Sequence, residues 1–128
     1  MKKLQIILIF FVLAATFSSC SHMLTGTWTV QKYASFKPGE QGVTLSNIGT
    51  ITFQNNGNGE KNISYALFDL TREDNLPFKW SAFDSYVTIE SENSEFAKIW
   101  IITKNKKKAQ IWKTTDGANE VKVLELVR

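Results

Sequence analysis

Few side chains in this sequence could carry out chemistry. The chain has one cysteine, Cys20, and one histidine, His22, which are too few and too close to the N-terminus for a Ser-His-Asp triad or a cysteine–histidine metal centre. Glu90 and Glu92 share one face of an expected strand and Glu95 follows closely, and carboxylate pairs can hydrolyse glycosidic bonds when they lie at a set separation. Nothing in the sequence places these carboxylates at that separation. The sequence therefore predicts a protein that is not an enzyme and uses no cofactor or metal.

Cys20 ends a short apolar segment at the start of the chain. Lys2 and Lys3 open this segment, and the run from Leu4 to Ser19 is shorter than the roughly 20 residues that a membrane-spanning helix needs. A basic start, a short apolar run and small residues are the parts of a secretory signal. The sequence Phe17-Ser18-Ser19-Cys20 resembles the lipobox of bacterial lipoprotein signals. This resemblance implies that residues 1–19 are removed, that Cys20 carries lipid, and that residues 20–25 tether a domain to a membrane of the cell envelope.

The residues that remain after such cleavage suit one envelope domain. Ser21, not Asp, follows Cys20 and no acidic run comes after it, which by analogy with lipoproteins favours the periplasmic face of the outer membrane. Once Lys2 and Lys3 leave, 13 basic residues face 12 acidic ones, so the domain has no basic excess for nucleic-acid binding. Residues 26–128 have the length of a single domain with one core.

The mature chain has the pattern of short strands separated by turns. β-branched and aromatic residues alternate with polar ones, and no long stretch has helical spacing. Gly and Asn at residues 55–59 predict a hairpin turn, and residues 35–47 and 71–77 are expected to be loops. Eight strands at this spacing indicate a sandwich or a barrel, and short successive turns favour a closed meander. The expected strands are residues 27–33, 50–54, 61–69, 78–83, 86–91, 96–104, 109–115 and 120–127.

Several short motifs point to one family. Gly26-Thr27-Trp28 resembles the Gly-x-Trp signature of lipocalins, and Ile51-Thr52-Phe53, Asn56-Gly57 and Phe78-Lys79-Trp80 are similar to small lipocalin-like lipoproteins of Bacteroidetes-type bacteria. The resemblance implies an all-β fold, an eight-stranded up-and-down antiparallel barrel that is closed where its first strand begins. It also implies that Trp28 packs across the closed end against a basic residue after the last strand, which here is Arg128.

The aromatic residues allow two functions. Eight-stranded barrels either fill with side chains or hold one small ligand. If a cavity exists, the residues expected to line it are Phe53, Phe68, Trp80 and Trp100, and the ligand would be small and apolar or amphipathic. If the rings fill the barrel, the protein is expected to bind another envelope protein through an apolar outer face or through the loop at residues 35–47.

The strands around residues 105–108 predict apolar side chains on the outer face of the barrel. Residues 98–102 are apolar on both strand faces, so some Ile or Trp surface is expected to point outward. A two-residue turn was expected to pair Trp100 with Ile111, and a three-residue turn to pair Trp100 with Trp112. The sequence leaves both registers open.

Topology sorts the charges between the two ends of such a barrel. Lys106, Lys107 and Lys108 fall at the end where the first strand begins, near the expected lipid on Cys20, so they are expected to contact the membrane surface. The alternative is that these lysines only keep a hairpin soluble. The opposite end is expected to carry the longest loop, residues 35–47, placed as a lid would be. This end is also expected to be acidic, through Glu40, Glu73, Asp74, Glu92, Glu95, Asp116 and Glu120.

Overall fold

The computed structural model describes residues 23–67, 70–115 and 119–128 as nine strands. The expected signal, Cys20, the first residues of the tether and Phe68 lie outside these ranges. The strands are β1 (Gly26–Phe36), β2 (Val43–Phe53), β3 (Asn58–Leu67), β4 (Leu70–Asp74), β5 (Pro77–Phe83), β6 (Tyr86–Glu90), β7 (Ile99–Lys106), β8 (Ala109–Thr115) and β9 (Val121–Val127).

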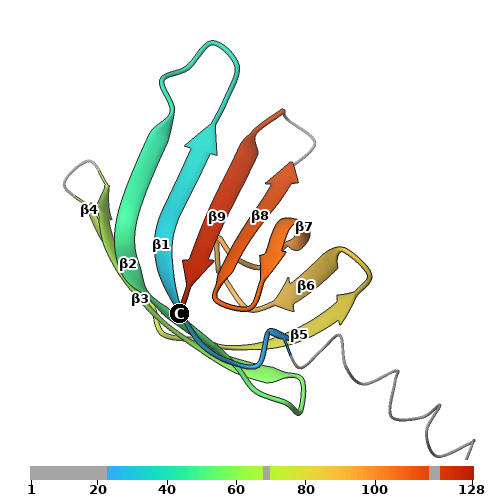
Figure 1. The fold of residues 1–128 in the computed structure, drawn as a ribbon. Helices are drawn as coiled ribbons and strands as arrows, with labels where there is room; N and C mark the ends of the chain where they lie inside the picture. The colour runs from blue at the N-terminus through green and yellow to red at the C-terminus, as the bar shows by residue number, and fades with distance from the viewer. Residues whose placement is uncertain (1–22, 68–69, 116–118) are drawn as a thin grey trace, which may run out of the picture.

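Eight of these strands close into an antiparallel barrel (Figure 1). The sheet runs β2-β1-β9-β8-β7-β6-β5-β3-β4, and an additional pairing of β2 with β3 joins its two sides. Closure leaves no free edge along the barrel wall. The expected fold, an eight-stranded antiparallel barrel, is confirmed. Within the described ranges, no helix is long and apolar enough to cross a membrane.

β4 is the strand that is not part of the eight-stranded barrel, and its presence shows that one expectation was wrong. Residues 71–77 were expected to be a loop, but Leu70–Asp74 form a strand on β3. β4 and β5 keep one register along β3, with Ile63 opposite Asp74 and Glu60 opposite Pro77. They are therefore two halves of one strand that leaves β3 at residues 75 and 76. The polar sequence of β4 concealed it, because backbone pairing and not a buried side-chain face holds this strand.

β1 and β2 are longer than expected, which removes the proposed lid. The loop at residues 35–47 is wrong, because β1 continues to Phe36 and β2 begins at Val43, leaving a connection of only residues 37–42. Gly49 on β2 has φ 143° and a Cβ there would lie 2.1 Å from the Asn62 backbone oxygen. Glycine at this position therefore lets β3 approach β2 closely, which the barrel needs to close.

The β7–β8 hairpin has neither of the expected registers. Its turn is two residues long, with Lys106 opposite Ala109, but the register shifts between Ile102 and Lys104. Ile102 therefore pairs with Trp112, and both expected partners of Trp100 are wrong. β7 continues to Lys106, so the turn lies at Lys107 and Lys108, later than the expected pairs require, and this position displaces both of them. The bulge between Ile102 and Lys104 shifts the pairs beyond it by one further residue, in the opposite sense.

Aromatic rings fill the middle of the barrel. The Phe53 ring contacts the rings of Phe78, Trp80 and Trp112 at centroid distances of 5.4, 5.3 and 5.8 Å, all edge to face. Trp100 lies 6.4 Å from Trp112 on the other side. Edge-to-face rings at these distances are in favourable contact. Among the described residues, every buried core residue falls between Leu24 and Leu126, so the segment Ser21–Arg128 contains all of the described core.

Candidate binding pocket at the open end of the barrel

The end of the barrel where β1 begins is closed by Trp28 and Arg128. The Arg128 guanidinium carbon lies 4.1 Å from the centroid of the Trp28 ring, a cation–π contact. Its Nη1 and Nη2 donate to the carbonyls of Thr25 (2.6 Å) and Met23 (2.9 Å), and its Nε donates to Lys107 O (2.8 Å). One side chain thus ties the first described residues and the β7–β8 turn to the last residue. The structure brings together the two residues that the lipocalin resemblance pairs.

The residues expected to line a cavity lie in the packed core instead. Phe53, Trp80 and Trp100 are buried, and the rings contact one another as described above. The indole nitrogens of Trp80 and Trp100 donate to backbone carbonyls at 3.0 Å, so the rings are fixed in place. The fourth expected lining residue, Phe68, lies outside the described residues. The three described rings belong to the packed core, and Trp80 also borders a hollow of about 250 Å³ beside Gly57 and Lys79.

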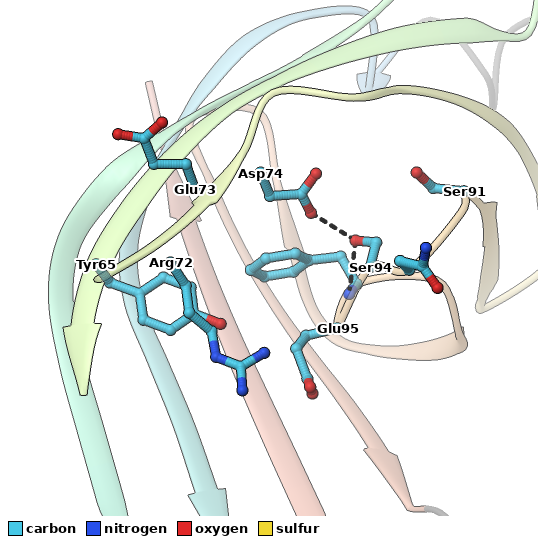
Figure 2. Close-up of a pocket in the computed structure, with 9 residues that line it drawn as sticks. Tyr65, Arg72, Glu73, Asp74, Ser91, Ser94 and Glu95 are labelled. Carbon is cyan, nitrogen blue, oxygen red and sulfur yellow. Dashed lines mark hydrogen bonds between the residues drawn. The ribbon is translucent and has the colours of Figure 1, made fainter. Parts of the chain in front are cut away.

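A pocket of about 510 Å³ lies at the other end of the barrel, between β3, β4 and residues 91–98 (Figure 2). We call this end the open end. Residues 91–98 join the ends of β6 and β7 that lie away from Trp28 and Arg128. The pocket is lined by Tyr65, Arg72, Glu73, Asp74, Ser91, Asn93, Ser94, Glu95 and Phe96. Most of these side chains are polar, so the pocket differs in chemistry from the aromatic core beneath it.

A buried ion pair forms one wall of the pocket. Lys61 shares the inward face of β3 with Ile63, and its side chain is only 1% exposed. Its Nζ lies 3.0 Å from Asp74 Oδ1 and donates to Ser91 Oγ at 2.8 Å. Ser94 Oγ donates to the other Asp74 oxygen at 2.6 Å (Figure 2). A buried ammonium needs such partners, so this cluster holds β4 and residues 91–94 in fixed positions over β3.

A second ion pair holds the middle of residues 91–98, the connection between β6 and β7. Lys122 on β9 donates to Glu95 at 2.6 Å with its side chain 8% exposed. The hydrogen bond from Lys122 holds the pKa of Glu95 below its usual value. Burial alone would lower the pKa of Lys122, but the hydrogen bond to Glu95 and the neighbouring negative charges outweigh burial and raise it. Burial raises the pKa of nearby Tyr33 to about 12, so its phenol stays neutral at alkaline pH values where a free tyrosine ionises.

Phe96 forms the floor of the pocket. Its ring is buried, lies 5.2 Å from the Tyr33 ring, and belongs to the core cluster as well as to the pocket lining. The Trp100 indole nitrogen donates to the Phe96 carbonyl at 3.0 Å, which fixes the backbone at this point. Phe96 therefore separates the polar pocket from the aromatic core.

Arg72 is the cation of the pocket that has no partner of its own. Within the described residues, Arg72 makes no ion pair or hydrogen bond. Figure 2 shows the Arg72 guanidinium beside Tyr65, on the side of the pocket where Glu95 lies. The Glu73 carboxylate points away from both. The Arg72 charge favours the ionised form of Glu95 and thereby contributes to its low pKa. Asp74 and Glu95 are neutralised by buried lysines, so the group left to receive a ligand is a guanidinium, which suits a carboxylate or phosphate.

An apolar hollow adjoins this pocket at Ser91. It has a volume of about 610 Å³ and lies where the chain leaves β3 between β4 and β5. Its apolar lining comes from Leu76, Pro77 and Phe78, and Leu76 is 45% exposed. The polar pocket and the apolar hollow share Ser91, so a cationic site lies next to an apolar surface.

Sequence reasoning assigned Glu73, Asp74 and Glu95 to this end but missed the residues that make it a pocket. Lys122 alternates with Leu124 and Leu126, and this period of two could have placed it on the inward face. Lys61 alternates with Ile63 in the same way. Arg72 carried no such signal, because β4 itself was not foreseen.

No model of a known protein family matches the chain, and no curated protein matches it either. Among the residues that the structure describes, no three His, Cys, Asp or Glu side chains gather as metal ligands. The fold and the site together define a closed eight-stranded antiparallel barrel with a filled core and a polar pocket at one end.

Proposed function

We propose that this chain is a lipocalin-like, lipid-anchored and non-catalytic protein of the bacterial cell envelope that binds a small amphipathic ligand at the open end of its barrel. The observation that carries the ligand proposal is Arg72, an exposed cation that makes no ion pair or hydrogen bond within the described residues, in a pocket whose two buried lysines are both paired. The lipobox at Cys20 supports the anchor, and a barrel of this size supports a binding role.

The two adjoining hollows define the class of ligand. An anionic group, a carboxylate or a phosphate, would bind the Arg72 guanidinium, and an apolar part would lie on Leu76, Pro77 and Phe78. A wholly apolar ligand in the barrel centre is not supported, because Phe53, Trp80 and Trp100 occupy that space. The proposal therefore keeps the amphipathic ligand and moves its site from the centre to the rim.

Native mass spectrometry of the Ser21–Arg128 domain exported to the periplasm tests the ligand proposal. We expect a mass above that of the denatured chain, and we expect it to fall to the bare mass in Arg72→Ala and in Leu76→Ser. Lys113→Ala, an exposed lysine on β8 that lines neither the polar pocket nor the apolar hollow, is the matched control and should retain the added mass. A bare mass for the wild-type domain, or equal retention in Arg72→Ala and Lys113→Ala, contradicts the proposal.

The anchor has its own test. In the full chain, Cys20→Ser should abolish incorporation of labelled fatty acid and leave the chain uncleaved, whereas Ser21→Ala should do neither. Labelling that persists in Cys20→Ser would show that the lipobox resemblance is misleading.

A second candidate is a filled barrel that acts through its outer surface, as an interaction or accessory module. The packed aromatic core favours it, and so does a group of exposed apolar side chains on β5, β6 and β7. Both roles can coexist, since the pocket and these side chains lie at different ends of the barrel.

A further inference from the structure

An apolar strip crosses the outer face of the barrel next to the closed end. Phe83 is 83% exposed, Tyr86 pairs with it across the β5–β6 hairpin, and Ile101 pairs with Tyr86 on the next strand. Ile99, 60% exposed, extends the strip along β7. These four residues are the apolar strip. Their strand neighbours Val87 and Trp100 point inward and are fully buried, so strand alternation forces the strip outward.

The apolar strip gathers most of the large hydrophobic side chains that the described residues expose. Of the seven large hydrophobic side chains that are exposed in the described residues, these four lie on three adjacent strands, and Phe83, Tyr86 and Ile101 are direct cross-strand neighbours. Phe83 is the last residue of β5, directly before the polar turn residues Asp84 and Ser85, and its side chain is the most exposed of the seven. Clustered exposed apolar side chains on a domain of this size indicate a contact surface.

Lysines surround this strip. Lys113 lies directly opposite Ile101 on β8, and the exposed Lys104 and Lys106 follow along β7. Lys107 and Lys108 form the turn beyond them. Two carboxylates lie on this face, Asp84 in the β5–β6 turn and Glu90, which shares the outer face of β6 with Tyr86. The face is thus apolar at its centre and mainly cationic along its β8 side and at the closed end.

The chain enters the barrel at the same end. Met23 and Leu24 line a small cleft together with Ala82, Asp84 and Asn105, so the first described residues lie beside the hairpin that carries Phe83. Cys20 is three residues before Met23, which spans at most about 10 Å. If Cys20 carries lipid, as proposed above, this face lies within about 10 Å of the bilayer surface.

We propose that the apolar strip and the lysines around it are a docking face for an anionic phospholipid bilayer. Phe83 and Tyr86 would enter the interfacial region, where aromatic side chains are favoured, and the lysines would contact lipid phosphates. An aromatic hairpin tip with a cationic rim fits a bilayer better than a protein partner, because it protrudes and is rimmed mainly by charge of one sign. Docking through this face points the pocket with Arg72 away from the membrane.

The test uses the Ser21–Arg128 domain, which lacks Cys20 and so cannot carry lipid. We expect it to sediment with vesicles of phosphatidylglycerol and phosphatidylcholine, to bind phosphatidylcholine vesicles at least tenfold more weakly, and to be released by salt. Phe83→Ser should weaken binding to the anionic vesicles about tenfold, and the triple variant Lys106→Ser, Lys107→Ser, Lys108→Ser at least tenfold. Phe36→Ser removes an aromatic side chain that is exposed at the opposite end, and it should change nothing.

A fluorescent probe at one position tests the docking face by a signal other than binding affinity. The domain contains no cysteine, so Phe83→Cys and Phe36→Cys each create one thiol for a polarity-sensitive fluorophore. Anionic vesicles should shift the emission of the probe at residue 83 to shorter wavelength and leave the probe at residue 36 unchanged. Circular dichroism of each variant confirms that the barrel is intact.

Three results would overturn the docking face. They are the absence of wild-type binding to anionic vesicles, equal binding by Phe83→Ser and Phe36→Ser, and self-association that Phe83→Ser abolishes without any vesicle binding, which would assign the strip to a protein contact. Because this domain has no lipid, its vesicle binding is independent of the Cys20 test and of the Arg72 test, and each proposal can fail alone.

Discussion

Loss of Asp74 should destabilise the barrel far more than loss of its partner Lys61. Asp74→Asn leaves an ammonium that is 1% exposed facing a neutral amide, with the Ser91 hydroxyl as its remaining acceptor at 2.8 Å within the described residues. Removing one partner of a buried ion pair costs about 3–5 kcal/mol, and the retained serine places this case near the low end, about 3 kcal/mol. Lys61→Met keeps the alkyl chain and removes the charge. The Asp74 carboxylate still accepts a hydrogen bond from Ser94 and is 14% exposed, so the cost should be only about 1 kcal/mol.

The assay is urea unfolding of the Ser21–Arg128 domain for the wild type, both single variants and the double variant. In the double variant neither charge of this pair remains, so its stability should return to within about 1 kcal/mol of the Lys61→Met value, giving a coupling energy of about 2–4 kcal/mol. Equal costs for the two single variants would refute the reasoning, because they would show that the ammonium is not desolvated. So would additive costs in the double variant.

Two further predictions concern pH and backbone conformation. Tyr33 has its folded pKa raised from 10.0 to about 12, so the stability from its neutral phenol is present below pH 10 and is lost as the pH rises from about 10 to about 12. The loss should reach about 1.4 kcal/mol by about pH 11 in the wild type, and Tyr33→Phe should remove this part of the alkaline decline in urea unfolding. Gly49→Ala should cost more than about 3 kcal/mol or prevent folding, because its Cβ would lie 2.1 Å from the Asn62 oxygen. Gly39→Ala, also at positive φ but with no atom within 4 Å, should cost only about 1 kcal/mol, and similar losses at the two glycines would contradict the steric argument.

The barrel could be predicted because its signals are local. Alternating apolar residues and Asn-Gly turns fix strand direction and hairpin ends, and the expected strand at Ala109–Thr115 has the bounds that the structure gives it. Long-range pairing was harder. The exposed strand β4 has no apolar face, and the register of β7 on β8 depends on a bulge near Thr103. Both features are decided by backbone contacts that side-chain patterns do not record.

The pocket could be predicted only in part. Its carboxylates were placed at the correct end because turn order alone decides which end a loop occupies. The large aromatic residues were ambiguous, since the same rings can line a cavity or fill it, and only their mutual contacts distinguish the two. Lys61 and Lys122 were overlooked because lysine is seldom buried, although their alternation with Ile63 and Leu124 marked an inward face.

A filled core also makes the two proposed functions separable. Edge-to-face rings around Phe53 occupy the space between the pocket at Phe96 and the closed end at Trp28, and the pocket shares no lining residue with the small cleft at Met23. Close-packed rings of this kind hold one arrangement and give no second state through which binding at one end could alter the other. Arg72→Ala should therefore leave vesicle binding unchanged, and Phe83→Ser should leave the carried mass in native spectra unchanged. Coupled losses, in variants whose circular dichroism is that of the wild type, would show that the barrel interior is less rigid than its ring contacts indicate.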